Sequence, residues 1–211
     1  MACSAQPHPI GAAVNLLRNV LICLLLACAM QATAQHSGGD PRPATSAAPE
    51  ARQFDFMIGQ WELEVRPKIS SIAAMIHGAP KLVGTWKAWR AFDGFGIDDE
   101  VRIVDASGNP VSLSHAMRVF SASESRWSAT TMDVYRGRVA VSSGAMQGRD
   151  MVMNGSGTDA EGKPTLTRAR YTDIAPDAFR VQQDRSSDNG QTWDEAVLVI
   201  AAKRVSASAP R

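Results

Sequence analysis

Residues Phe54 to Trp61 read Phe-Asp-Phe-Met-Ile-Gly-Gln-Trp, and the rest of the chain reads as short strands separated by turns. Directly after this octet, Trp61, Leu63 and Val65 alternate with charged residues. Such alternation predicts a strand with one buried and one solvated face. The octet therefore marks where the folded domain begins, with a short helical plug ahead of the first strand.

Turn signals recur at short intervals beyond the octet, from Phe92-Asp93-Gly94 to Asp188-Asn189-Gly190. Asn-Gly favours the primed turn whose twist matches two paired antiparallel strands. The spacing predicts an all-β fold, an antiparallel up-and-down barrel of about eight to ten strands. Closure removes the exposed edges of an open sheet. Residues 69–80 are ambiguous between a short helix and a loop over the barrel mouth.

The N-terminal residues have the composition of an export signal. Arg18 is the one charged residue before Asp40, and Val20 to Ala29 are all apolar. This run is shorter than the roughly 20 residues that span a bilayer, so it suits a secretory signal. Ala32-Thr33-Ala34 predicts cleavage before Gln35, which makes residues 1–34 a signal peptide and the protein periplasmic or secreted.

A second interpretation of the same segment stays open. Leu25-Leu26-Ala27-Cys28 resembles a lipobox. Processing there would anchor the protein to a membrane face through a lipid on Cys28. Under the first interpretation no stable membrane insertion is expected after cleavage.

Removal of residues 1–34 changes which chemistries are available. All three cysteines and Arg18 are lost, which leaves 21 of the 22 Lys and Arg residues against 21 Asp and Glu. Disulfides, a cysteine nucleophile and thiolate metal sites are excluded, and a neutral protein is a poor partner for nucleic acid. Only His77 and His115 belong to the folded part, too few for a three-histidine zinc site. We expect no metal and no cofactor.

The remaining boundaries follow from composition. Residues 35–52 are rich in Gly, Pro, Ala and Ser without apolar periodicity, and residues 205–211 are similar. Such segments bury too little apolar surface to offset their ordering entropy. We therefore predict a disordered linker over 35–52, one barrel domain over 53–204 and a disordered tail over 205–211.

Gly59-Gln60-Trp61 resembles the Gly-x-Trp signature of calycins, the superfamily of lipocalins and fatty-acid-binding proteins. The resemblance implies that Trp61 packs at the closed end of the barrel under a basic residue of the last strand, here Lys203 or Arg204. With residues 94–100 and 187–193, the chain resembles a family of uncharacterised secreted bacterial proteins with a lipocalin-like domain. That family implies an architecture and no agreed reaction.

Residues Ser186 to Trp193 also match the Asp-box of sialidase propellers, Ser-x-Asp-x-Gly-x-Thr-Trp. In those proteins the motif braces a hairpin, and several copies recur at regular spacing. This chain carries one copy. We interpret it as a structural turn and not as a sign of glycosidase chemistry.

Two polar residues are candidate catalytic groups. His115 alternates in phase with Val111, Leu113, Met117 and Val119 and is expected to face the interior with them. Asp133 shares the phase of Trp127 and Thr131. If both point inward, they form a candidate acid-base pair. A core histidine and a turn-capping aspartate are the structural alternatives.

The candidate ligand-binding residues are Trp86, Met117, Gln183 and Arg185. Gln183 and Arg185 share the phase of Phe179 and Val181. A guanidinium at this position either meets a ligand carboxylate or is a solvated charge at the rim. Trp86 and Trp89 point to opposite faces of one strand, so one of them lies in the interior.

These patterns leave three functions open. The first is an exported barrel that binds a small hydrophobic or amphipathic ligand in its cavity. The second is a cofactor-free isomerase, cyclase or hydrolase that uses His115 and Asp133. The third is a packed interaction module of the cell envelope. The sequence leaves the oligomeric state open.

Overall fold

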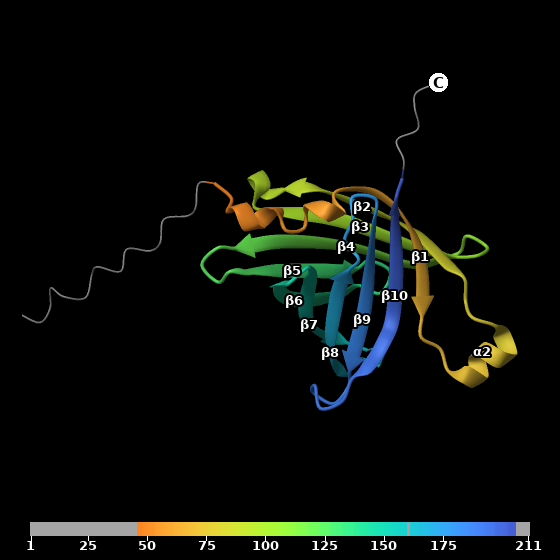
Figure 1. Cartoon of the computed structure of the whole chain (residues 1–211). Helices are drawn as coiled ribbons and strands as arrows, with labels where there is room; N and C mark the ends of the chain where they lie inside the picture. Colours follow the sequence, from red (N-terminus) through yellow and green to blue (C-terminus); the bar gives the residue numbers. More distant parts are fainter. Residues whose placement is uncertain (1–45, 160, 206–211) are drawn as a thin grey trace, which may run out of the picture. The chain divides into compact units, whose positions relative to one another are not determined.

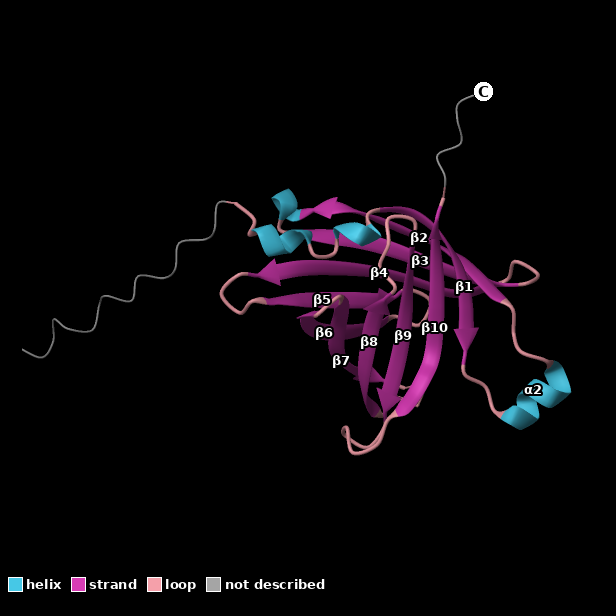
Figure 2. Cartoon of the chain, viewed as in Figure 1, coloured by secondary structure: helices cyan, strands magenta, loops and turns pink. Residues whose placement is uncertain are grey.

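Ten antiparallel strands close into one barrel in the computed structural model, which describes residues 46–159 and 161–205. Each strand pairs with its sequence neighbours, and the first strand pairs with the last (Figures 1 and 2). The strands are β1 (Gly59–Pro67), β2 (Leu82–Ala91), β3 (Gly96–Asp105), β4 (Pro110–Ser121), β5 (Arg126–Asp133), β6 (Arg138–Gln147), β7 (Asp150–Thr158), β8 (Pro164–Thr172), β9 (Ala178–Ser186) and β10 (Asp194–Arg204). The predicted antiparallel, calycin-like barrel is confirmed.

Helices are few and short in the described part of the chain. The ambiguous segment between β1 and β2 contains α2 (Ser71–His77), which stands away from the strands in Figure 1. The described residues also form three 3-10 turns, which are η1 (Pro49–Arg52), η2 (Asp55–Met57) and η3 (Phe92–Gly94). Within the described residues, no helix has the length and apolar character needed to cross a membrane.

The described chain starts upstream of the predicted domain boundary. The signal peptide predicted for residues 1–34, the alternative anchor at Cys28 and the tail from residue 206 lie outside the described residues. The linker predicted to run to residue 52 is wrong at its C-terminal end, because η1 is helical and Ala51 is buried. Arg90 Nη1 donates to the Ala51 carbonyl at 2.8 Å. Local composition could not predict this boundary, because Ala51 is ordered by its contact with an arginine that is distant in the sequence.

The octet seals one end of the barrel around Trp61, which is fully buried. Its Nε1 donates to the Met57 carbonyl at 2.7 Å, and its register partner on β10 is Arg204. The Arg204 Cζ lies 4.0 Å from the centroid of the Trp61 ring. Of the two basic residues that the resemblance pointed to, Arg204 is the one that covers the tryptophan.

Gly59 is required by this closure for two reasons. Its φ is +128°, a conformation that side chains with a Cβ rarely adopt. A Cβ at this position would also overlap Nη1 of Arg204. The Gly of Gly-x-Trp therefore leaves the space that the guanidinium occupies.

Aromatic rings fill the closed end above the Trp61 layer. Phe54 meets Trp127 edge to face at 4.8 Å and Tyr171 at 5.5 Å between ring centroids. The alternation of Phe54, Phe56 and Ile58 along the octet predicts these three residues as the plug. Phe54 and Met57 are the fully buried pair, while Phe56 and Ile58 are partly buried. Strand-like alternation fails here because η2 turns the chain and points Met57 inward.

Replacing the sealing tryptophan should destabilise the barrel. We expect Trp61→Ala to lower the free energy of unfolding by roughly 3–5 kcal/mol, because a large buried ring and its cation-π contact are lost. Trp89→Ala, on the outer wall where the residue is 43% exposed, should change the free energy of unfolding by less than about 1 kcal/mol. Chemical denaturation of both variants measures the difference. Equal losses would contradict the assignment of Trp61 as the seal.

Candidate functional site

The end of the barrel opposite Trp61 opens into a cavity of about 520 Å³. Two further spaces of about 230 and 150 Å³ lie against it, and Thr131 and Gln183 line all three. The inner spaces reach Arg118 and Tyr171, next to the aromatic plug. The barrel interior is therefore hollow from the mouth to the layer behind Phe54.

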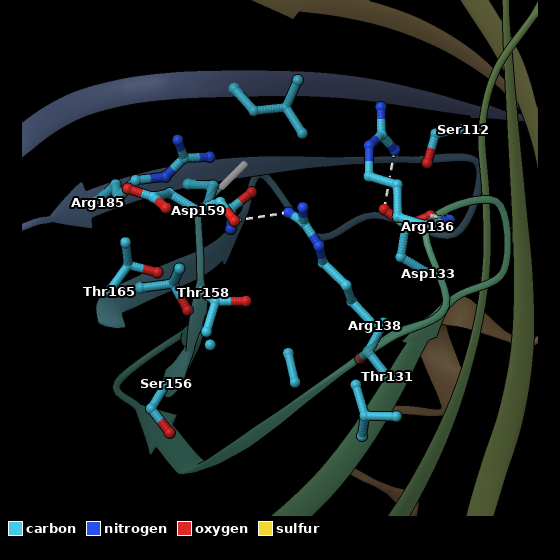
Figure 3. Close-up of a pocket in the computed structure, with 16 residues that line it drawn as sticks. Ser112, Thr131, Asp133, Arg136, Arg138, Ser156, Thr158, Asp159, Thr165 and Arg185 are labelled. Atoms are coloured by element: carbon cyan, nitrogen blue, oxygen red, sulfur yellow. Dashed lines mark hydrogen bonds and ion pairs between the residues drawn. The ribbon is translucent and has the colours of Figure 1, made fainter. Parts of the chain in front are cut away.

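Charged residues surround the mouth, as Figure 3 shows. Arg136 Nη1 lies 2.8 Å from Asp133 Oδ2, and Arg138 donates to the backbone carbonyl of Asp159 at 2.7 Å. The Asp159 carboxylate accepts backbone N–H groups of its own turn. These bonds order the β5–β6 and β7–β8 connections around the opening.

Arg185 differs from its neighbours at the mouth. Its register partner on β10 is Asp194, but that carboxylate lies 2.6 Å from Lys68 Nζ. The Arg185 side chain is exposed at the rim, and no hydrogen bond or ion pair joins its guanidinium to another residue of the described chain. Its guanidinium is therefore available to a ligand at the edge of the cavity.

The deep end holds a buried ion pair. Arg118 and Asp99 are bound to each other, and their side chains are 7% and 3% exposed. Trp86 Nε1 donates to Asp99 Oδ1 at 3.0 Å. On its other side, Arg118 Cζ lies 5.6 Å from the centroid of Phe54, so the pair forms a floor between cavity and plug.

The walls of the inner space combine apolar and polar side chains. Val101, Ile103, Val181 and Ile200 give it an apolar surface, and Ser112, Ser114, Tyr171 and Gln183 contribute hydroxyl and amide groups. A mostly apolar enclosure with a few convergent polar groups is typical of small-molecule sites.

Four of the predicted site residues line the interior. Trp86, Gln183, Arg185 and Asp133 all line the cavity. For Gln183, Arg185 and Asp133 this is the side that alternation indicated, and Trp86 is the interior member of the pair that it forms with Trp89. Asp133 is held by Arg136. Their orientation is settled by the structure, and their roles in binding or catalysis stay predictions.

His115 and Met117 lie on the outer wall, so their predicted place in the cavity is wrong. Met117 is 45% exposed, and the His115 ring lies 6.0 Å from that of Trp89 between centroids. Along β4, Ala116 and Arg118 point inward. Alternation separated the two faces of β4, but the face that carries Met117 and Val119 is the outer one, and Ser112, Ser114 and Ala116 line the cavity.

This placement overturns the predicted acid-base pair. On neighbouring strands, Ser114 pairs with Asp133 and His115 pairs with Met132. Directly paired residues share a face, so His115 and Asp133 lie on opposite faces of the sheet. Side chains on opposite faces do not bridge one reacting centre.

The sequence interpretation missed Asp99 and Arg118. One signal was available, because Arg118 alternates with Ala116 and Phe120 on a strand whose other face is apolar. The sequence does not identify Asp99 as the partner of Arg118, because the pairing depends on the register between β3 and β4. Within residues 46–159 and 161–205, no three His, Cys, Asp or Glu side chains gather closely enough to hold a metal ion.

The Asp-box is bonded within its own hairpin. Asp188 accepts from Ser186 Oγ at 2.7 Å and from Thr192 Oγ1 at 2.6 Å, and the Thr192 bond is the main cause that lowers the pKa of Asp188 to about 2. Asn189 and Gly190 have φ of 59° and 86°. Arg168 Cζ lies 4.7 Å from the centroid of the Trp193 ring. These contacts are those of a structural brace.

Comparison with known proteins adds little to this geometry. No family model matches the chain, and no curated protein matches it. A solved structure described as EF1p2_mFAP2b bound to DFHBI is similar, with 10% sequence identity and a TM-score of 0.36. The match covers 74% of this chain and 99% of that chain. At this level of similarity, the assignment of fold and site rests on the strand pairing and the cavity described above.

Breaking the buried pair should be more harmful than removing it. We expect Arg118→Met to lower the free energy of unfolding by roughly 3–5 kcal/mol, because it leaves the Asp99 carboxylate buried without its counter-charge. The double variant Asp99→Asn/Arg118→Met has no buried charge and should recover more than half of that loss. Urea denaturation of the three proteins tests this, and a double variant less stable than the single one would contradict it.

Proposed function

We propose that the protein binds a small apolar or amphipathic molecule inside the barrel. The observation that carries the proposal is the hollow interior, with its largest space of about 520 Å³ opening at the mouth. Trp86 supplies an aromatic wall, and the Gln183 side chain lines all three spaces. Arg185 supplies a positive charge for a polar end of the ligand. A packed envelope module would instead need a filled barrel.

The structure favours binding over the enzymatic alternative. The proposed acid-base chemistry needed His115 and Asp133 in one pocket, and they lie on opposite faces. A ligand site needs only a shaped enclosure with a few placed polar groups, which the interior provides.

A fluorescent probe and one blocking substitution test the binding proposal. The neutral dye N-phenyl-1-naphthylamine should bind and be displaced by members of a panel of fatty acids and hydrophobic metabolites. Ala169→Phe, which fills the wall shared by both inner spaces, should weaken binding by at least about tenfold. Fluorescence titration measures both.

The matched control is Ala201→Phe, an exposed position on β10. It should leave dye binding unchanged, and thermal unfolding of both variants identifies any loss of fold. If the wild-type protein binds neither the dye nor any panel member, or if the two substitutions act alike, the binding proposal fails.

We further propose that the protein acts outside the cytoplasm. The support is the charge and hydropathy pattern of residues 1–34. Expression of the full chain in a Gram-negative host should yield a product beginning at Gln35 in the periplasm or medium, or a lipid-modified product beginning at Cys28 in the membrane fraction. Intact mass measurement separates the two. An unprocessed chain in the cytoplasm would contradict export.

A further inference from the structure

The inner end of the cavity is lined by polar side chains whose hydrogen-bonding capacity the described chain does not fully use. Arg118 is 6% exposed and Tyr171 is 5% exposed, and both line the two inner spaces. In the described chain, Asp99 is the one ion-pair partner of Arg118, and no hydrogen bond of the Tyr171 hydroxyl or of the Gln183 amide is seen. Buried polar groups are normally hydrogen-bonded. Apart from the bond between Arg118 and Asp99, the side chains of Arg118, Tyr171 and Gln183 turn unused hydrogen-bonding groups toward one space, which indicates a place for a ligand atom that accepts hydrogen bonds.

The charge of this floor decides which acceptor fits. Arg118 has five N–H donors, but its positive charge is already balanced by Asp99. A ligand carboxylate at the same point would bring a second negative charge close to Asp99 and would lose its hydration in an enclosed site. A carbonyl oxygen accepts the same hydrogen bonds at a much smaller desolvation cost.

We infer that the ligand carries an uncharged carbonyl-type acceptor on an apolar body, and that this end binds at the floor formed by Arg118, Asp99 and Tyr171. The inference rests on the proposed binding function and specifies its ligand class. The body of the ligand lies against Trp86, Val181 and Ile200. Any anionic group on the ligand remains at the mouth, where Arg185 has no carboxylate partner in the described chain.

Two dyes of matched shape test this chemistry. Prodan is a neutral naphthyl ketone whose emission moves to longer wavelength when its carbonyl accepts a hydrogen bond. Its partner is the naphthoate in which a carboxylate replaces the propionyl group. The wild-type protein should bind Prodan at least about fivefold more tightly than the naphthoate. The naphthoate carboxylate is repelled by the negative charge of Asp99 and loses its hydration, whereas the Prodan carbonyl is uncharged.

Tyr171→Phe removes one donor and keeps the ring. It should weaken Prodan binding by about three- to tenfold, the range expected for one hydrogen bond, and shift the bound emission to shorter wavelength. The control is Tyr135→Phe, which changes the other tyrosine of the chain at an exposed position. That variant should alter neither affinity nor emission.

Asp99→Asn is a third variant, which should increase the affinity for the naphthoate. The amide keeps an oxygen for Trp86 Nε1 but leaves the Arg118 charge unbalanced, so the naphthoate should gain affinity relative to Prodan. If this variant does not fold, Tyr171→Phe decides the question alone.

The outcomes separate this inference from the binding proposal. If Ala169→Phe blocks Prodan but the wild-type protein binds the naphthoate equally well, or Tyr171→Phe leaves both affinity and emission unchanged, the interior binds ligands and the floor assignment is overturned. If neither dye binds the wild-type protein, the inference fails together with the function on which it rests. A preference for Prodan that Tyr171→Phe reduces and Asp99→Asn reverses supports it.

Discussion

The contact between the Arg204 guanidinium and the Trp61 ring joins the first and the last strand of the barrel. It lies at the seam where β1 meets β10, and the same guanidinium donates to the carbonyls of Ile58 at 2.7 Å and Pro176 at 2.6 Å. One side chain therefore ties the first strand, the plug before it and the turn before β9. The rest of the architecture depends on this seal, because it closes one end and leaves the interior to open at the other.

The seal and the candidate site are connected through the plug. Phe54 packs on Trp127 and Tyr171, and Arg118 approaches it from the cavity side. The buried pair with Asp99 adds little net stability by itself, since the desolvation of two charges offsets most of their attraction. What the pair does provide is a fixed charged surface at the bottom of a space whose walls combine apolar and polar side chains.

Local sequence patterns were sufficient to predict the strands but insufficient to predict which face of each strand lies inside the barrel. The strand predicted from the alternation of Trp61, Leu63 and Val65 lies within β1, and the Asn189-Gly190 turn has the positive φ angles that the dipeptide favours. Alternation also placed Gln183 and Arg185 on the interior face. For β4, alternation identified two faces, but only strand pairing determines which face is inside. The partnership of Asp99 with Arg118 depends on the same long-range register.

The outward-facing apolar residues of β4 reverse the usual relation between hydrophobicity and tolerance to mutation. Met117 and Val119 are 45% and 40% exposed, whereas Ser112, Ser114 and Ala116 line the cavity. On this strand, a change from methionine to a polar residue alters only the solvent-exposed outer surface of the barrel. A change from serine to leucine takes up the volume that a ligand would occupy. Larger apolar side chains, which improve most cores, would here fill the cavity, so Ser112, Ser114 and Ala116 must stay small for the interior to remain open.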